Sequence, residues 1–362
     1  MNNSNRHINR YILIIGFLFL LNLPNLVMLS SLENTQSNEN KKNTKSPDFN
    51  LNNPKRLVSE YKNYYEDNFG LRTTLINIYL SFKVKILKEN PLPNHVVKGQ
   101  DGWYFLGNDH NDILNDTFGN VPFTKAQLNA ITQNLESTNT YLQSKNIKFY
   151  IVVPPNKQTI YQEKLPYHFG PHTKRLEQLQ NHLEIKNSLH IVSLEPRLFS
   201  EKKHQRLYHK TDTHWNDYGA YWGYAETLEV IKKDFDITPI QLSEYSMEAT
   251  PINGDITAMI NENIPENGIA LQKIKPSQID TISPIYTFQH YKNRTKNLKL
   301  LMHSDSFSNA WIPFFNESFG ETVYIRTYEL NHALIEKIQP DIVIFEIVER
   351  NLLTLINIKK SR

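Results

Sequence analysis

The chain contains no cysteine, and this excludes several kinds of site at once. None of its 362 residues can form a disulfide, bind zinc as a thiolate, act as a thiol nucleophile or carry a lipoprotein's lipid. The chain also lacks an excess of either charge, because 40 basic residues stand against 37 acidic ones. No general basic field draws the protein to nucleic acid, so we expect no nucleic-acid partner.

The remaining composition is that of an ordinary globular protein. Hydrophobic residues make up 39% of the chain, which is enough for a buried core. The length suits one large α/β domain. Residues 31–54 are the exception, because Asn, Ser, Lys and Glu dominate there. We expect this stretch to be a flexible tether.

A long apolar run lies at the N-terminus. Basic residues between positions 6 and 10 precede the run Tyr11–Leu29, whose length is near the roughly 20 residues that cross a hydrocarbon core. A basic flank before such a run directs the following chain outward. We therefore expect residues 1–30 to be a signal anchor in the cell membrane and residues 55–362 to be extracytoplasmic, either periplasmic or on the outer face. A cleaved secretion signal is the alternative.

Two elements are expected near the start of the domain. Apolar residues recur at helical spacing and predict a helix: Leu71, Leu75, Ile78, Phe82 and Ile86. Two short apolar runs between residues 96 and 106 surround a Gly-rich turn and predict a hairpin. We expect that hairpin to be a lid or entry element.

Apolar strand patterns then alternate with helical ones. Strands are expected at residues 147–153, 190–194, 298–303, 322–325 and 341–348. Thr124 and Gln127 have the spacing of a capping box that opens one of the intervening helices. Such alternation is typical of an α/β fold with a mainly parallel sheet and helices on both faces. Residues 236–296 have weaker periodicity, and we expect an insertion over the functional edge of the sheet.

The strand expected at residues 298–303 stops abruptly at Ser304-Asp305-Ser306, and a helical stretch follows. A serine at such a turn exposes its hydroxyl at the sheet edge, where backbone N–H groups and the positive helix end can stabilise an oxyanion. Ser306 is therefore the candidate nucleophile. The alternative is that these residues only cap the helix.

Asp212 and His214 form the second candidate group. Residues two apart in an extended segment face the same way. A carboxylate beside an imidazole fixes its tautomer and stabilises the imidazolium that forms when the imidazole takes a proton from serine. His214 is thus the candidate general base, and we predict neither a metal nor a cofactor. A structural turn, or a metal site that also includes His209, would explain the same residues.

These motifs together resemble the SGNH-hydrolase-like proteins of alginate O-acetylation. The resemblance lies in Asp212–Trp215 and Ser304–Ser308, with lesser matches at Asp101–Leu106, Val153–Lys157 and Glu349–Arg350. It extends over roughly residues 55–355 in the order expected of the family. One difference is Ser304, which stands where the family usually has glycine.

The resemblance implies an SGNH-like three-layer sandwich with a serine-dependent acetyltransferase activity. It also implies a polysaccharide acceptor and a membrane-bound O-acyltransferase that supplies acetyl groups. No carbohydrate-binding module is expected. The candidate substrate-binding residues are Trp215, Arg326, Tyr328 and Lys157. Two alternatives stay open: an esterase that removes acetyl groups from a polysaccharide, and a non-catalytic polysaccharide-binding or assembly factor.

Overall fold

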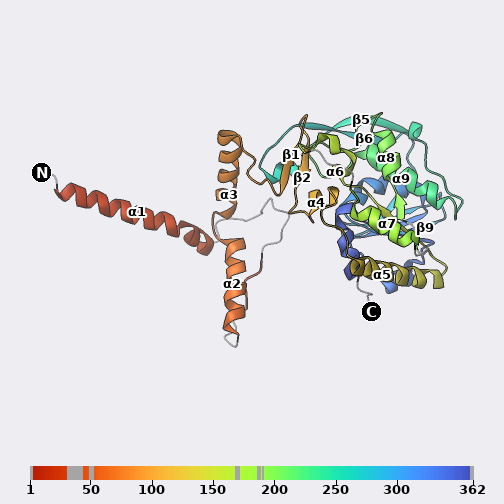
Figure 1. Ribbon diagram of the computed structural model, residues 1–362, viewed down its shortest axis with the longest axis horizontal. Coiled ribbons are helices and arrows are strands. Elements are labelled where there is room, and N and C mark those ends of the chain that lie inside the picture. Colours follow the sequence, from red (N-terminus) through yellow and green to blue (C-terminus); the bar gives the residue numbers. More distant parts are fainter. Residues whose placement is uncertain are drawn as a thin grey trace. The chain divides into compact units, whose positions relative to one another are not determined.

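The computed structural model describes residues 3–30, 44–48, 53–167, 172–185, 189 and 191–358 (Figure 1). The chain divides into two compact units. One comprises Met1–Pro91 with Ala258–Glu262, and the other comprises Leu92–Thr257 with Asn263–Arg362. Most of the expected tether lies outside the described residues.

The first unit is helical. Its helices are α1 (Asn3–Ser30), α2 (Pro54–Asn68) and α3 (Arg72–Ser81), and a π-helical turn follows at Phe82–Leu87. Within α1, the predominantly apolar segment Arg10–Ser30 has 21 residues and spans about 30 Å, the thickness of a hydrocarbon core. This helix fits a single-pass anchor. The helix predicted around residues 71–86 is confirmed, and its π-helical end is the part that the periodicity did not reveal.

The second unit is built on a mixed sheet of seven strands in the order β4-β3-β11-β9-β10-β8-β7. The parallel strands are β4 (Ile191–Ser193), β3 (Lys148–Val153), β11 (Ile342–Glu346), β9 (Lys299–His303) and β10 (Glu321–Ile325). Each lies within a predicted strand or overlaps it. Two antiparallel strands complete the sheet, β8 (Phe288–Asn293) and β7 (Ile279–Ile285). Both come from the region expected to be an insertion.

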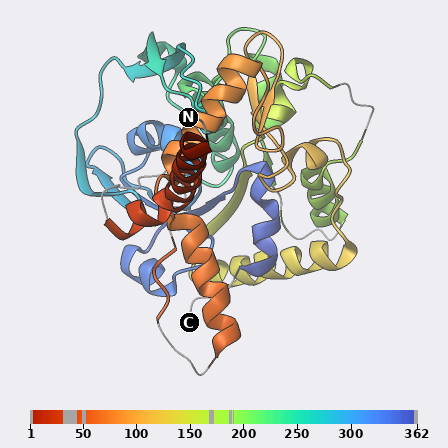
Figure 2. The ribbon, with the colours of Figure 1, turned by 90° about the vertical axis from the view of Figure 1, so that its left-hand side faces the viewer.

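Helices cover both faces of this sheet, so the three-layer prediction is confirmed. One face packs against α5 (Lys125–Ser144), α7 (Arg175–Ile185), α12 (His332–Ile338) and the 3-10 helix Glu349–Asn357. Helices α5 and α7 lie side by side in both views (Figures 1 and 2). The other helical layer contains α8 (Glu195–Glu201), α9 (Asp217–Ile231) and α11 (Ile312–Ser318).

Local sequence explains where these helices begin. At α5 the predicted capping box is present, because the Thr124 hydroxyl accepts from the Gln127 N–H at 3.2 Å and the Gln127 side chain accepts from the Thr124 N–H at 2.8 Å. At α9 the Asn216 side chain accepts from the Gly219 N–H at 3.0 Å. Each contact satisfies a backbone donor that the first helical turn leaves free.

Two hairpins and several short helices complete the unit. Strands β1 (Val96–Lys98) and β2 (Tyr104–Leu106) form the predicted hairpin. Strands β5 (Tyr245–Ile252) and β6 (Glu266–Lys273) pair along their whole length. The short helices are α4 (Ile113–Thr117), α6 (Lys157–Ile160) and the 3-10 turns Gln162–Lys164, Leu242–Glu244 and Ser306–Trp311. Helix α10 (Asp255–Met259) begins in this unit, and its last two residues belong to the first unit.

The first hairpin is not the lid that we expected. Val96 and Phe105 are fully buried, and the Trp103 ring packs on Tyr161 with centroids 4.2 Å apart. Such burial belongs to a core element, because a lid must be able to leave its contacts.

Candidate active site

The turn that follows β9 carries the candidate nucleophile. The Asp305 carboxylate caps the 3-10 helix that begins at Ser306: its Oδ1 accepts from the Phe307 N–H at 3.0 Å, and its Oδ2 accepts from the Val348 N–H at 2.9 Å. The capping function therefore belongs to Asp305. The Ser306 hydroxyl is left for another contact, as a nucleophile requires.

Ser304 is accommodated without crowding this turn. Its side chain is buried, and its hydroxyl accepts from the Arg326 Nη1 at 3.0 Å and from the Ser308 hydroxyl at 3.0 Å. The serine found in place of the usual glycine thus adds hydrogen bonds beneath the turn.

His214 connects the serine to Asp212. Its Nε2 lies 2.8 Å from the Ser306 Oγ, and its Nδ1 lies 2.8 Å from the Asp212 Oδ1. The same carboxylate oxygen accepts from the His214 backbone N–H at 2.9 Å, which fixes the short Asp-Thr-His segment. Burial raises the pKa of Asp212, but hydrogen bonds and the charge of His214 outweigh it and hold that pKa below its ordinary value. The carboxylate is therefore ionised where it can orient and stabilise a charged imidazole.

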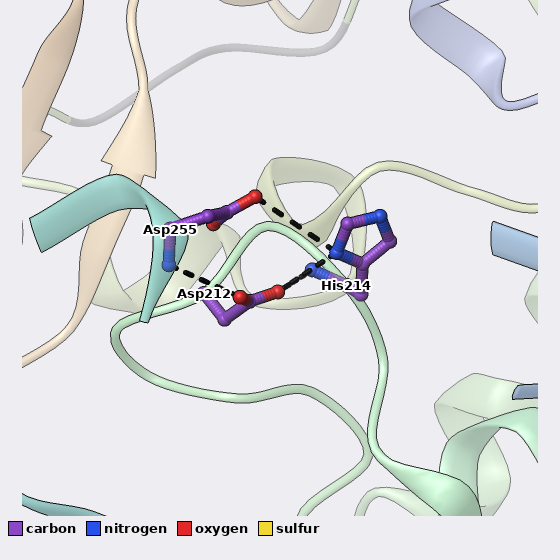
Figure 3. A group of neighbouring side chains, drawn as sticks. All are labelled: Asp212, His214 and Asp255. Atoms are coloured by element: carbon purple, nitrogen blue, oxygen red, sulfur yellow. Dashed lines mark hydrogen bonds and ion pairs between the residues drawn. The ribbon is translucent and has the colours of Figure 1, made fainter. Parts of the chain in front are cut away.

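A second carboxylate, Asp255, lies beside this pair, and the sequence analysis missed it (Figure 3). Its backbone N–H donates to the Asp212 Oδ2 at 3.1 Å, and its own Oδ2 is 3.9 Å from the His214 Nδ1. Burial and the Asp212 charge raise the pKa of Asp255. Gly254 permits this approach, since a Cβ at that position would lie 2.2 Å from the Thr211 carbonyl oxygen.

Asp212, His214 and Asp255 also have ligand atoms that lie within 4.8 Å of one another and could hold a metal ion. The metal site considered from the sequence had His209 in the place of Asp255. In the described structure, the Asp212 Oδ1 and the His214 Nδ1 are joined by a hydrogen bond. Metal binding and the hydrogen-bonded chain from serine to carboxylate would therefore compete for the same atoms.

A cavity of about 220 Å³ opens at these residues. Its lining comes from the His214 loop, the Ser306 turn and β5, namely His209, Asp212, His214, Trp215, Ile252, Ser306, Phe307, Asn309 and Ala310. Burial lowers the pKa of His209 to about 4, so its imidazole is neutral at physiological pH. Among the described residues, its buried Nδ1 has no hydrogen-bond partner. The cavity thus presents a second, neutral imidazole beside the candidate base.

Two of the candidate substrate-binding residues are buried in the protein, which gives their expected roles no support. Lys157 is 2% exposed, and its amino group donates to the carbonyls of His209, Lys210 and Asp212 at 3.1, 3.2 and 2.7 Å. Trp215 is also 2% exposed, and its indole N–H donates to the Phe307 carbonyl at 3.0 Å. Lys157 supports the loop that carries Asp212, and Trp215 joins that loop to the serine turn. Neither presents a free group to a sugar.

The other two candidates, Arg326 and Tyr328, support the serine turn. Besides Ser304, the Arg326 guanidinium binds the Asp305 carbonyl, the Ser308 hydroxyl and the Asn309 side chain. The Tyr328 hydroxyl donates to the Asp305 Oδ2 at 3.1 Å. These contacts engage both groups within the protein and give their predicted substrate contact no support.

Comparison with known proteins decides the family. A family model described as the SGNH hydrolase-like domain of the acetyltransferase AlgX matches residues 96–284. The chain belongs to this AlgX-type family. The matched range contains Asp212 and His214, whereas Ser306 lies beyond it. The family resemblance inferred from the motifs is thereby confirmed.

Solved structures share the AlgX-type fold over most of the chain. Bacillus cereus PatB1, determined with a sulfonyl adduct, is 18% identical with a TM-score of 0.58, over 73% of this chain and 98% of that one. A DHHW family protein from Eubacterium siraeum is 17% identical with a TM-score of 0.54, over 74% and 99%. The O-acetyltransferase domain of Pseudomonas putida AlgJ is 16% identical with a TM-score of 0.50, over 74% and 94%. No curated protein sequence matches the chain.

Proposed function

We propose that this protein transfers acetyl groups to hydroxyls of an exported polysaccharide through an acetyl-Ser306 intermediate. One observation carries the proposal. This protein belongs to an acetyltransferase family, and in it a continuous series of hydrogen bonds connects Ser306 through His214 to Asp212. All three residues line an open cavity. That order of groups suits a serine nucleophile activated by an oriented imidazole.

In the first step, the Ser306 oxygen attacks the acetyl carbonyl of the donor while the His214 Nε2 accepts the serine proton. Asp212 stabilises the imidazolium through the Nδ1 hydrogen bond. When the tetrahedral intermediate collapses, the bond to the donor's leaving group breaks and His214 returns the proton to that group. In the second step, His214 accepts the proton of a sugar hydroxyl as this hydroxyl attacks the acetyl carbon. Ser306 then leaves and regains its proton.

The oxyanion formed in each step needs hydrogen-bond donors, and we assign the Ser306 backbone N–H and the Asn309 amide to this role. The Asn309 side chain lines the cavity and is bound by the Arg326 guanidinium. Because a guanidinium only donates, its partner must be the Asn309 Oδ1, and the Nδ2 group remains available as a donor. Asn309 also lies one turn after Ser306 in a 3-10 helix, where side chains three residues apart lie one above the other.

For the acceptor, His209 is our candidate contact. It is a neutral imidazole in the cavity wall. A neutral imidazole can both donate to and accept from a sugar hydroxyl.

The anchor indicates on which side of the membrane the reaction takes place. Helix α1 would hold the catalytic domain, residues 55–362, on the extracytoplasmic face, where a membrane-bound O-acyltransferase could supply acetyl groups. The basic residues that precede the apolar run support this orientation.

The test is the partition of acetyl groups between sugar and water. The full-length protein in detergent would receive an activated acetyl ester and a panel of polysaccharide fragments, and both acetylated fragments and free acetate would be measured. Transfer to a fragment faster than hydrolysis, lost in Ser306→Ala and kept in Ser283→Ala, supports the proposal. Ser283 is a suitable control because it lies on β7 and its hydroxyl donates only to the Phe288 carbonyl among the described residues.

Two outcomes favour the alternatives. Consumption of the ester with release of acetate alone, at every fragment concentration, would indicate an esterase. Polymer acetylation in the producing cell that survives Ser306→Ala would indicate a binding or assembly factor.

A further inference from the structure

Helix α3 and the π-helical turn after it carry an apolar stripe that faces solvent. Its members are Leu75 at 46%, Ile78 at 61%, Tyr79 at 51%, Phe82 at 51% and Ile86 at 68% exposed. Residues at this spacing lie on one side of a helix. The sequence pattern is that of a helix packed on a core, yet within the helical unit no described residue covers this side. Contiguous apolar patches of this kind mark a surface that contacts something else.

Basic residues accompany the stripe. Between residues 71 and 90 there are four basic residues, Arg72, Lys83, Lys85 and Lys88, and one acidic residue, Glu89. Lys83 pairs with Glu89 at 2.6 Å, whereas Lys85 and Lys88 are exposed and have no ion pair among the described residues. An apolar side flanked by lysines is the chemistry of a helix that lies in the interface of an anionic membrane.

The same structural unit contains the helix that fits a membrane anchor. A chain tethered to a membrane meets its surface at a high effective concentration, so even a weak interfacial helix would be bound most of the time. A lipid surface therefore suits this stripe better than a soluble partner that must be captured from solution.

We propose that α3 and the π-helical turn lie in the interface of the membrane that α1 crosses. The stripe would enter the boundary between headgroups and acyl chains, and Lys85 and Lys88 would lie among anionic headgroups. This second contact would hold Pro91, where the helical unit ends, close to the membrane surface. The inference rests on the anchor and does not depend on the proposed acetyl transfer.

Because the chain has no cysteine, a single introduced cysteine can carry a fluorophore without background labelling. Full-length Ile78→Cys, labelled on the stripe, would be compared with Asn77→Cys, labelled on the opposite side of α3. Both would be reconstituted in phosphatidylcholine vesicles that contain phosphatidylglycerol. Quenching by lipids with brominated acyl chains reports contact with the bilayer, and quenching by iodide reports contact with water.

We expect brominated lipid to quench the Ile78→Cys label at least about two-fold more than the Asn77→Cys label, with iodide giving the reverse order. Adding Lys85→Glu and Lys88→Glu should reduce the lipid quenching, and reduce it more with phosphatidylglycerol than without it. Iodide quenching of the Ile78→Cys label would place the stripe in water and overturn the proposal. Protection from both quenchers would show that protein covers the stripe, which overturns it equally.

Discussion

Lys157→Met would remove the buried amino group that holds the loop carrying Asp212. Methionine is of similar length and fits an apolar site, but it cannot donate to the carbonyls that Lys157 now binds. The Lys210 carbonyl keeps a second donor, the Tyr104 N–H at 2.8 Å. The carbonyls of His209 and Asp212 have no other donor among the described residues. Since each buried carbonyl left unpaired costs about 1–3 kcal/mol, we expect the two to lower the free energy of unfolding by about 2–6 kcal/mol at pH 7.

The pH dependence of this loss is a sharper test. Burial lowers the pKa of Lys157 to about 7 from its ordinary value of 10.5. Between these values the unfolded lysine binds more protons than the folded one, so this group makes wild-type stability rise with pH. The methionine variant lacks the group. At about 1.4 kcal/mol for each pKa unit, the stability difference between wild type and variant should widen by about 2–3 kcal/mol from pH 7 to pH 9.

Urea unfolding followed by tryptophan fluorescence at both pH values would measure these differences. Lys148→Met is the matched control, because Lys148 pairs with Asp234 at the surface, where the two side chains are 56% and 32% exposed. Its loss should stay within about 1 kcal/mol. If Lys157→Met behaves like this control, the role assigned to Lys157 is wrong. A difference from wild type that narrows as pH rises would show that the pKa of Lys157 is not lowered by burial.

Three further predictions concern the site. Asp212→Asn should lower the rate of acetyl transfer by about 10³–10⁴-fold, because an amide cannot hold His214 in the required tautomer; an unchanged circular dichroism spectrum with more than a tenth of the wild-type rate would contradict this. Gly268→Ala should raise the KM for the polysaccharide and leave the rate of ester hydrolysis within about two-fold of the wild-type rate. The reason is that a Cβ at this position would lie 2.6 Å from the His209 Cε1 and displace the imidazole ring. An unchanged KM would show that His209 does not contact the acceptor. Dialysis against a chelator should leave the transfer rate unchanged, and a loss restored by zinc would favour the metal arrangement.

The sequence predicted the parts of the fold that local patterns specify. The strand-and-helix alternation is set by side-chain periodicity, and the start of α5 by the capping box at Thr124, so both were predicted closely. Strands β7 and β8 were missed as members of the sheet. They are the last two strands at one end of the sheet, and most of their side chains are at least partly exposed. Such strands lack the apolar runs that mark a buried strand.

In the candidate site, too, the residues marked by local patterns were predicted and those placed by long-range contacts were not. The two-residue spacing of Asp212 and His214 and the strand-to-helix turn at Ser306 are local signals, and the structure brings these residues together. Asp255 reaches the pair only because Gly254 packs against a distant carbonyl, and no local pattern reports such a contact. Lys157 has the sequence context of a solvated lysine, and only the folded loop around it reveals its burial.

Intact-protein mass spectrometry after exposure to an activated acetyl ester tests the central claim most directly. The full-length wild type, Ser306→Ala and His214→Ala would be measured side by side, with consumption of the ester followed in each. The proposed mechanism predicts one acetyl adduct on the wild type and none on either variant. An adduct that persists in Ser306→Ala, or a wild type that neither gains the adduct nor consumes the ester, would contradict it.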